Sequence, residues 1–456
     1  MRANDGHRLA KLLLSKRVVY QFHLSSVDMA QEIAPAPPGH LPDGALADML
    51  SAGANKHSTE DFLHRALAAV RTHLGLQVAY ISEFEGNDAV FRVVDAPGLE
   101  HLAKPGDRHS LDDVYCRHIL AGRLPELIPD TAAEPIAMAL PVTAAIPIGA
   151  HVSVPLRLPD GAVYGMFCCL GPASDPSLNA RDLATIRTFA ELAAYEIAED
   201  RDRQTTRNRS IARIDGAIAV GRSSVYQPIW NLCDRRPIGF EALARFAAEP
   251  VRGPDQWFAE AAAVGLGPDL ELAAIDTAID GLPYLPAPLY LAVNASPATV
   301  IDPRFARLFE SLPLDRLVLE ITEHDAIADV DAINMALLPL RARKMRVAVD
   351  DAGAGYSGLQ QILSLKPDLI KLDRALIQDI HRDPAKRSLA VALASFARAT
   401  DSQLIAEGVE TEAELAMLRT AGIENIQGYL LGRPMPLADA AELAAHSTPR
   451  AGQLLQ

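Results

Sequence analysis

The sequence is poor in features that would indicate several common classes of protein. Its 456 residues include four cysteines, Cys116, Cys168, Cys169 and Cys233, and no two of them have C-x-x-C spacing. This argues against a disulfide framework and against a zinc site of the usual spacing. We therefore expect reduced thiols in a cytoplasmic protein.

Long apolar runs and an excess of basic residues are also missing. No apolar stretch reaches the length of a membrane span. The apolar patch near the N-terminus is interrupted by Lys11 and Lys16, and no small-residue cleavage site follows, so we expect no signal peptide. The formal net charge of −15 disfavours nucleic acid as a general partner.

The length and the hydrophobic content of 49% predict two or three globular domains. We expect a poorly patterned leader with a Pro-rich connector at residues 1–50 and an α+β domain at residues 51–178. A helical linker at 179–210, a second domain at 211–445 and a tail at 446–456 would follow.

The first domain reads as helix, hairpin, irregular middle, hairpin and long helix. Ser58 is expected to cap the first helix, with Asp61 three residues later, and Gly75 is expected to end it. Strand-like runs follow at residues 77–84, 89–94, 150–158 and 162–170, and a long helix begins near residue 179. This order is typical of an α+β domain.

Three segments make this region resemble a GAF domain, a small-molecule sensor module. They are the helix TEDFLHRALAAVRTHLGL, the segment DDVYCRHIL and the pair HVSVPLRLPDGAVYGMFCCLG. The resemblance implies an unknown small-molecule ligand. Cys116 could be a bilin or redox thiol, and His118 or His151 could be a haem ligand, but a structural role is favoured for each.

An apolar stripe in the long helix has two interpretations. Its residues are Leu183, Ile186, Phe189, Ala190, Ala193 and Ile197. We favour the interpretation that the first half of the stripe belongs to the core of the first domain. The alternative is a dimerising signalling helix between the two domains.

The second domain contains eight strand-like runs, most of them separated by helical patterns. The runs are residues 225–229, 238–242, 289–294, 317–321, 347–350, 369–372, 404–406 and 426–430. Repeated strand–helix units predict an α/β fold of the TIM-type (β/α) barrel kind. In such barrels the chemistry lies at the carboxyl ends of the strands.

Polar side chains gather where these strands end. They are Glu241, Asn294, Glu320, Glu323, Asp350, Asp351, Lys371, Asp373, Glu407 and Glu410, while Gln427 lies at the last strand. At one barrel mouth they would form a ring of carboxylates around one amine. Like charges this close raise each other's pKa or bind a cation.

The ligand types indicate which cation. Carboxylate and amide oxygens favour Mg²⁺ or Mn²⁺ over zinc, and the only histidines of this half, His324, His381 and His446, are scattered. Two metal ions would suit phosphodiester hydrolysis, because one activates water and both shield the phosphate. Arg245 could bind a phosphate oxygen and Lys371 could orient the water.

Seven motifs make this half resemble an EAL-domain cyclic-di-GMP phosphodiesterase. In order they are FEALAR, VNAS, LEITE, DDAGAGYSGL, KPDLIKLD, IAEGVET and QGYLLGRPMP, and they cover nearly all of residues 211–445. The resemblance implies a TIM-type barrel that uses Mg²⁺ or Mn²⁺, two ions in all, to open cyclic di-GMP to linear pGpG. It also implies a homodimer.

The same resemblance implies a role for each matched residue. The metal ligands would be Glu241, Asn294, Glu320, Asp350 and Asp351. Lys371 would hold the water, Glu407 would act as general base or ligand support, and Glu323 would anchor the central loop. The substrate would be contacted by Gln227, Leu243, Arg245, Asp373, Glu410, Gln427 and Pro434.

The central loop departs from the family pattern DDFGTGYSSL. This chain has Ala352, Ala354 and Gly358 in place of Phe, Thr and Ser. The changes remove an apolar anchor and a hydroxyl, so we expect a more mobile loop. Our hypothesis is an active enzyme whose loop depends on help from outside, such as the first domain. Unchanged rate and metal affinity after deletion of residues 1–200 would contradict it.

Two rival functions are considered. One is a catalytically weak EAL receptor that binds cyclic di-GMP and signals through protein interaction. The other is a barrel that serves mainly as a partner platform. Metal-dependent turnover would separate both from the enzyme. The sequence contains no GGDEF-like stretch, so a cyclase role is not supported.

Overall fold

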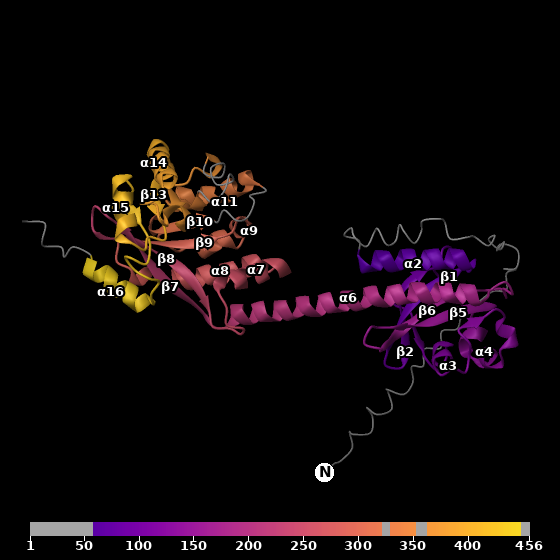
Figure 1. Cartoon of the computed structure of the whole chain (residues 1–456). Helices are drawn as coiled ribbons and strands as arrows, with labels where there is room; N and C mark the ends of the chain where they lie inside the picture. Colours follow the sequence, from indigo (N-terminus) through magenta and orange to yellow (C-terminus); the bar gives the residue numbers. More distant parts are fainter. Residues whose placement is uncertain (1–57, 322–328, 353–362, 448–456) are drawn as a thin grey trace, which may run out of the picture. The chain divides into compact units, whose positions relative to one another are not determined.

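The computed structural model describes residues 58–321, 329–352 and 363–447 of the chain. The chain divides between Asp202 and Arg203 into two units, and each is described by itself below (Figure 1). Helix α6 (Ala180–Ala219) contributes residues to both units. Within the described ranges, no helix is both long enough and apolar enough to cross a bilayer.

A six-stranded antiparallel sheet forms the middle of the first unit, with the order β3-β2-β1-β6-β5-β4. The strands are β1 (Val78–Glu85), β2 (Asp88–Asp95), β3 (Arg108–Ser110), β4 (Leu127–Ile128), β5 (Ala150–Arg157) and β6 (Val163–Gly171). The four strands expected from the sequence are confirmed as β1, β2, β5 and β6.

Helices cover both faces of this sheet. Helix α2 (Thr59–Leu74) and the first half of α6 pack on one face, where Ile186, Phe189 and Ile197 are buried (Figure 1). The core interpretation of this part of the apolar stripe is therefore confirmed. The other face is covered by short helices, which are α3 (Cys116–Leu120), η1 (Thr131–Ala133), α4 (Pro135–Ala139) and α5 (Pro141–Ala145).

The ends of α2 are those expected from the sequence. The Asp61 amide donates to Ser58 Oγ at 3.2 Å, and the Ser58 amide donates to the Asp61 carboxylate at 3.4 Å. Gly75 ends the helix with a φ of 66°, a conformation that glycine adopts without strain.

The thiols of the first unit have structural positions. The neighbouring residues Cys168 and Cys169 point to opposite faces of β6 and are buried in two different apolar clusters. Burial raises the pKa of both thiols. Cys116 is also buried, so a packing role accounts for these three side chains.

The second unit is a closed barrel with the strand order β10-β11-β12-β13-β14-β7-β8-β9, which confirms the predicted fold class. The strands are β7 (Arg222–Asn231), β8 (Arg236–Phe246), β9 (Tyr290–Ala295), β10 (Leu317–Ile321), β11 (Arg346–Ala352), β12 (Leu369–Leu372), β13 (Gln403–Ala406) and β14 (Asn425–Ile426).

Helices surround the barrel (Figure 1). The longer ones are α7 (Pro254–Val264), α8 (Gly267–Ile279), α11 (Val330–Ala342), α14 (Pro384–Ala399), α15 (Glu412–Thr420) and α16 (Leu437–Ser447). The shorter ones are η2 (Leu282–Tyr284), α9 (Pro297–Val300), α10 (Phe305–Leu308), η3 (Leu314–Arg316) and α13 (Arg374–Ile377). Outward-facing strand residues such as Leu291, Leu319 and Val347 pack beneath these helices in one apolar cluster.

The barrel differs from the expected pattern at two places. Strand β7 is antiparallel to both of its neighbours, because the short turn from Leu232 to Arg235 connects it directly to β8. The predicted strand at residues 426–430 is wrong beyond Ile426. There the chain turns, and Gly428 lies so close to the Val409 backbone that any side chain would clash with it.

Candidate active site

The inside of the barrel has an apolar layer and a polar layer. The apolar layer consists of Ile229, Tyr290, Ala292, Val318, Ala348, Leu369 and Ile405. Two residues after a member of this layer come Asn294, Glu320, Asp350, Lys371 and Glu407. Because strand side chains alternate between faces, a spacing of two places both layers inside the barrel. The polar layer therefore lies at the carboxyl ends of β9 to β13.

Lys371 is the hub of the polar layer. Its ammonium nitrogen lies 2.6 Å from Glu407 Oε1, 2.7 Å from Glu320 Oε2, 3.3 Å from Asp350 Oδ1 and 3.4 Å from Glu241 Oε2. The side chains of Lys371 and Glu320 are each 1% exposed, so water does not screen the interaction between these two groups. Four carboxylates thus share one buried cation.

Burial and the neighbouring charges shift the pKa values of Glu320 and Lys371. Burial raises the pKa of Glu320 well above its usual range, and Glu241, Asp350 and Glu407 add to the rise although Lys371 opposes it. Burial would lower the pKa of Lys371, but the surrounding carboxylates outweigh it and raise this pKa well above the usual range. The ammonium therefore stays charged.

The pKa values of Glu407 and Glu241 are shifted in opposite directions. Burial, with Asp350 and Glu241 nearby, raises the pKa of Glu407 to about 8 although Lys371 lowers it. For Glu241, burial is outweighed by Lys371 and by hydrogen bonds from Asn294 and Gln427, so its pKa is lowered. Two carboxylates of one site thus differ in proton affinity because of their hydrogen-bond donors.

Amide side chains hold Glu241 in place. Asn294 Nδ2 donates to Glu241 Oε1 at 2.9 Å, and Gln427 Nε2 donates to Glu241 Oε2 at 2.6 Å. Gln427 Nε2 is also 3.2 Å from Gln227 Oε1, and Gln227 Nε2 donates to the Gly432 carbonyl at 3.2 Å. The structure therefore brings Gln227 and Gln427 into the same network as Glu241.

The structure also describes the other predicted substrate-binding residues. Leu243 and Arg245 follow Glu241 at spacings of two on β8 and are half-buried, and Arg245 Nη1 donates to the Ala244 carbonyl at 2.7 Å. Asp373 precedes α13, and Glu410 forms an ion pair with Arg374 at 2.9 Å. Pro434 is half-buried before Met435, whose backbone pairs with Tyr226.

Several predicted positions lie outside the description of the site. Glu323, Ala354 and Gly358 are outside the described residues. Asp351 and Ala352 end β11, but only their backbone is described. The roles assigned to these residues stay predictions.

Sequence reasoning missed Tyr290, which lies beneath the polar layer. Its ring is 3% exposed, and within the described residues its hydroxyl has no hydrogen-bond partner. Burial raises the pKa of this hydroxyl, and Glu320, Lys371 and Glu241 are near enough to influence it. Gly239 makes room for the ring, because a Cβ there would lie 2.6 Å from it. The glycine inside the run IGFEAL was the available signal.

The donor set of the polar layer fits a hard divalent cation. It offers carboxylate oxygens and the Asn294 amide oxygen, the ligand types that Mg²⁺ and Mn²⁺ prefer. Among the residues that the structure describes, no three acidic, histidine or cysteine side chains already form a metal cage. The carboxylates converge on the Lys371 ammonium instead, so a bound cation would share their oxygens with it.

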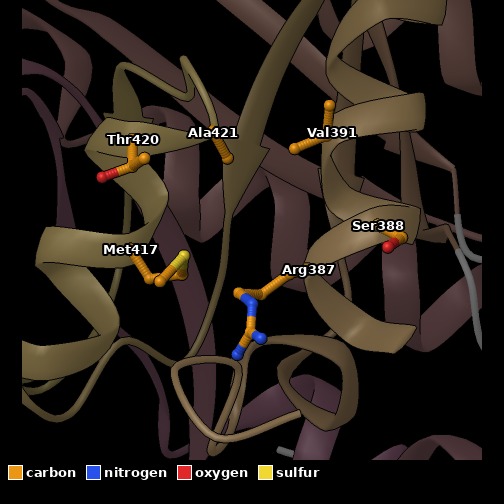
Figure 2. A pocket seen from close by; sticks show the side chains of 6 residues that line it. All are labelled: Arg387, Ser388, Val391, Met417, Thr420 and Ala421. Carbon is orange, nitrogen blue, oxygen red and sulfur yellow. The ribbon is translucent and has the colours of Figure 1, made fainter. Parts of the chain in front are cut away.

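A separate groove lies on the outside of the barrel, between α14 and α15 (Figure 2). It is lined by Arg387, Ser388, Val391, Met417, Thr420 and Ala421. None of these residues belongs to the polar layer and none carries a carboxylate. The groove therefore lacks the groups that the chemistry of the barrel mouth requires.

Comparison with protein families matches most of the chain. Residues 214–434 match the EAL domain model, and residues 56–198 match the GAF domain model. The EAL match contains every described residue of the polar layer. The GAF match contains the six-stranded sheet of the first unit.

Curated relatives are similar to part of the chain. An uncharacterized signaling protein of Caulobacter vibrioides is 30% identical over 300 residues, which are 61% of this chain and 37% of that protein. The cyclic di-GMP phosphodiesterase NbdA of Pseudomonas aeruginosa is 34% identical over 229 residues, 48% of this chain and 29% of that protein. The chain spans about a third of the length of these relatives.

One solved structure resembles both units. The EAL enzyme Bd1971, in its form bound to cAMP and cyclic di-GMP, is 18% identical with a TM-score of 0.50. The likeness covers 80% of this chain and 93% of that one. At this identity it supports the fold alone.

Proposed function

We propose that the chain is a metal-dependent phosphodiesterase, because residues 214–434 match the EAL domain model and residues 56–198 match the GAF domain model. Its substrate is cyclic di-GMP, which it hydrolyses to linear pGpG, and the GAF domain regulates the rate. The observation that carries the proposal is the buried cluster of four carboxylates around Lys371 at the carboxyl ends of the strands.

The cluster has more negative charge than Lys371 can balance. Carboxylates in a buried site tolerate this imbalance only by holding protons or by binding cations. We assign the ligand positions to Glu241, Asn294, Glu320, Asp350 and Asp351, with Mg²⁺ or Mn²⁺ at two places. When bound, these ions would activate the attacking water and shield the phosphate charge.

The protein side chains have separate tasks in this proposal. Lys371 holds the water, because its charged ammonium is a fixed donor at the centre of the cluster. Glu407 accepts the proton of that water at its carboxylate, which lies 2.6 Å from the Lys371 ammonium. Arg245, which lies on strand β8, binds a phosphate oxygen of the substrate.

The remaining roles concern the substrate and the central loop. Gln427 Oε1 is a buried acceptor without a partner among the described residues, so it is available to a substrate donor. We assign further substrate contacts to Gln227, Leu243, Asp373, Glu410 and Pro434. Glu323 would anchor the central loop.

The decisive experiment follows cyclic di-GMP and pGpG by chromatography with Mg²⁺ or Mn²⁺. The purified chain should convert cyclic di-GMP into pGpG, and a chelator or Glu241→Ala should abolish the conversion. Glu310→Ala removes an exposed carboxylate of the same barrel and should leave the rate unchanged. No turnover with either ion would contradict the enzyme.

A receptor is the second candidate, and one observation favours it. The Lys371 ammonium contacts four carboxylates, so the cluster already contains a cation of its own. A receptor would bind cyclic di-GMP tightly in the presence of chelator and would show no turnover with metal. Such a result would direct attention to Ala352 and Ala354 in the central loop.

We assign the ligand of the GAF domain to one face of its sheet. Ser82, His151 and Ser153 lie on this face, are at most 2% exposed, and have side-chain polar atoms without partners among the described residues. Buried polar atoms of this kind are normally satisfied. A ligand or water bound there would satisfy them.

Regulation, assembly and location complete the proposal. Candidate small molecules should shift the melting temperature of the intact chain, and a true ligand should also change its rate. A homodimer in the cytoplasm is the expected form, and light scattering of the purified chain would test its mass.

A further inference from the structure

A buried carboxylate outside the polar layer has an unusual set of partners. Glu414 lies in the first turn of α15, is 3% exposed, and accepts hydrogen bonds from the backbone amides of Asp379, Glu410 and Thr411, each at 3.0 Å. Backbone amides that lose such a partner inside a protein are costly to leave unpaired.

One carboxylate oxygen organises the start of the helix. Oε2 accepts from Glu410 and Thr411, and the Glu414 amide donates to Thr411 Oγ at 3.2 Å. This reciprocal pattern is a capping box, which begins many helices. It would not by itself indicate a role in the site.

The other oxygen reaches a different segment. Oε1 accepts from the amide of Asp379, 35 positions earlier in the chain and with a φ of 57°. Asp379 follows α13, which begins directly after β12, whereas Glu410 follows β13. One side chain therefore ties together the two segments that leave neighbouring strands at the barrel mouth.

These two segments carry residues assigned to the substrate. Asp373 begins the first segment, which is short and internally bonded: the Leu376 amide donates to the Asp373 carbonyl at 3.0 Å. Glu410 belongs to the second segment and pairs with Arg374 of the first at 2.9 Å. Gly408 approaches Arg374 so closely that a Cβ would lie 2.4 Å from Arg374 Cγ.

We propose that Glu414 is a positioning residue, which holds Asp373 and Glu410 at the spacing required to bind the substrate. This inference rests on the proposed phosphodiesterase function. The lower part of the site has its own support, because Leu372 pairs with Ala406 and the Glu407 amide donates to the Leu372 carbonyl at 3.1 Å. Loss of Glu414 therefore affects substrate binding more than the Lys371 cluster.

The test compares Glu414→Gln with Glu412→Gln in the full chain. Glu412 is an exposed carboxylate in the same first turn, so its variant makes the same change of charge without breaking the tie. In Glu414→Gln we expect the KM for cyclic di-GMP to rise roughly tenfold while kcat and Mn²⁺ affinity change less than about twofold. Glu412→Gln should match the wild type in all three quantities.

Hydrogen exchange gives a readout that does not depend on turnover. The amides of Asp379, Glu410 and Thr411 should exchange at least about tenfold faster in Glu414→Gln than in Glu412→Gln. If Glu414→Gln does not fold, Thr411→Val weakens the same capping box without changing the carboxylate. It should raise KM in the same direction by a smaller factor.

The outcomes distinguish this inference from the proposed function. A wild-type chain without turnover would overturn the proposed phosphodiesterase function. Hydrogen exchange would then still test whether Glu414 connects the two segments. Equal amide exchange rates in Glu414→Gln and Glu412→Gln would show that Glu414 does not connect the two segments. A KM unchanged in Glu414→Gln, or a fall in kcat and Mn²⁺ affinity instead, would overturn the positioning role.

Discussion

At the scale of single residues, the candidate site depends on one buried ammonium group. Lys371 is 1% exposed and is the common partner of Glu241, Glu320, Asp350 and Glu407. A buried charge is stable only when it is paired, so removal of the shared cation leaves the carboxylates to repel one another. Lys371 therefore contributes to folding as well as to the proposed chemistry.

Lys371→Met should separate these two contributions. It keeps the length of the side chain but removes the charge, and we expect unfolding free energy to fall by about 3–5 kcal/mol. Mn²⁺ should restore part of this loss, while hydrolysis stays abolished. Urea unfolding with and without Mn²⁺ measures the effect, and exposed Lys344→Met is the control. A loss no larger than that of the control would contradict this account.

A second residue-scale prediction concerns His151 of the first unit. Burial lowers its pKa to about 3, and its ring packs against Tyr115 at a centroid distance of 4.8 Å. In the unfolded chain the pKa is about 6.5. Between these values the unfolded state binds a proton that the folded state does not, so stability falls as pH decreases from about 6.5 towards 3.

His151→Gln should remove this part of the pH dependence. Urea unfolding of the full chain, followed by a probe of the first unit at pH 7 and pH 5, measures it. His64 is exposed in α2, so His64→Gln should keep the wild-type dependence. An equal loss of stability on acidification in wild type and His151→Gln would show that His151 is not the group responsible.

At the scale of elements, the short strand β14 depends on a close backbone contact. A Cβ on Gly428 would lie 2.1 Å from the Val409 carbonyl oxygen and 2.3 Å from its amide nitrogen. The Val409 amide in turn donates to the Gln427 carbonyl at 3.1 Å. The turn after β14 therefore holds the loop that carries Glu407 and Glu410.

Gly428→Ala should disturb this loop. We expect a loss of unfolding free energy of about 1–3 kcal/mol from overpacking, together with reduced turnover. Gly216→Ala is the matched control, because a Cβ at this helical glycine of α6 has no atom within 4 Å. That control should leave turnover unchanged and should raise stability by up to about 1 kcal/mol. Equal effects of both variants in thermal unfolding would contradict the close contact.

At the scale of the whole molecule, α6 is the element that both units share. In the second unit its residues Ile214 and Ala217 are fully buried with Trp257 of α7. Arg213 pairs with Glu260, which also pairs with Arg252, and the Arg252 guanidinium lies 3.9 Å from the Trp257 ring centroid. The end of α6 is thus an integral part of the barrel unit.

Glu260 is the centre of this contact. Burial would raise its pKa, but hydrogen bonds from Arg213, Ser210 and Arg252 outweigh burial and lower the pKa to about 2. The carboxylate therefore stays charged, and its contribution to stability is lost only as pH falls from about 4.5 towards 2. Phe246, at the end of the strand that carries Arg245, packs against Trp257 at 5.8 Å.

Arg213→Ala should weaken this contact, although Arg213 itself is not a residue of the candidate site. We expect faster proteolytic cleavage within residues 203–219 of α6 and a changed turnover of the intact chain, because the packing beside β8 is disturbed. Arg209→Ala removes an exposed arginine of the same helix and is the control. The same cleavage rate and turnover in both variants would show that this contact does not hold the end of α6 in the barrel unit.

Local sequence patterns predicted a large part of the fold. The capping box of α2, the strands of the first sheet and the (β/α) alternation are local, because each depends on residues a few positions apart. Strand β14 was predicted too long because the run IQGYL at residues 426–430 was interpreted as a strand. The close approach of Gly428 to Val409, which ends the strand, is a tertiary contact that composition does not show.

The sequence by itself determined which polar groups reach the barrel mouth, because the period of two along each strand places Asn294, Glu320, Asp350 and Lys371 on the inner side. Only the tertiary structure decided their partners. Gln427 bonds to Glu241 across 186 positions, and Lys371 bonds to Glu320 across 51. Such contacts arise when the barrel closes and strands distant in sequence become neighbours. No local pattern therefore predicts the carboxylate partners of Lys371 or the backbone partners of Glu414.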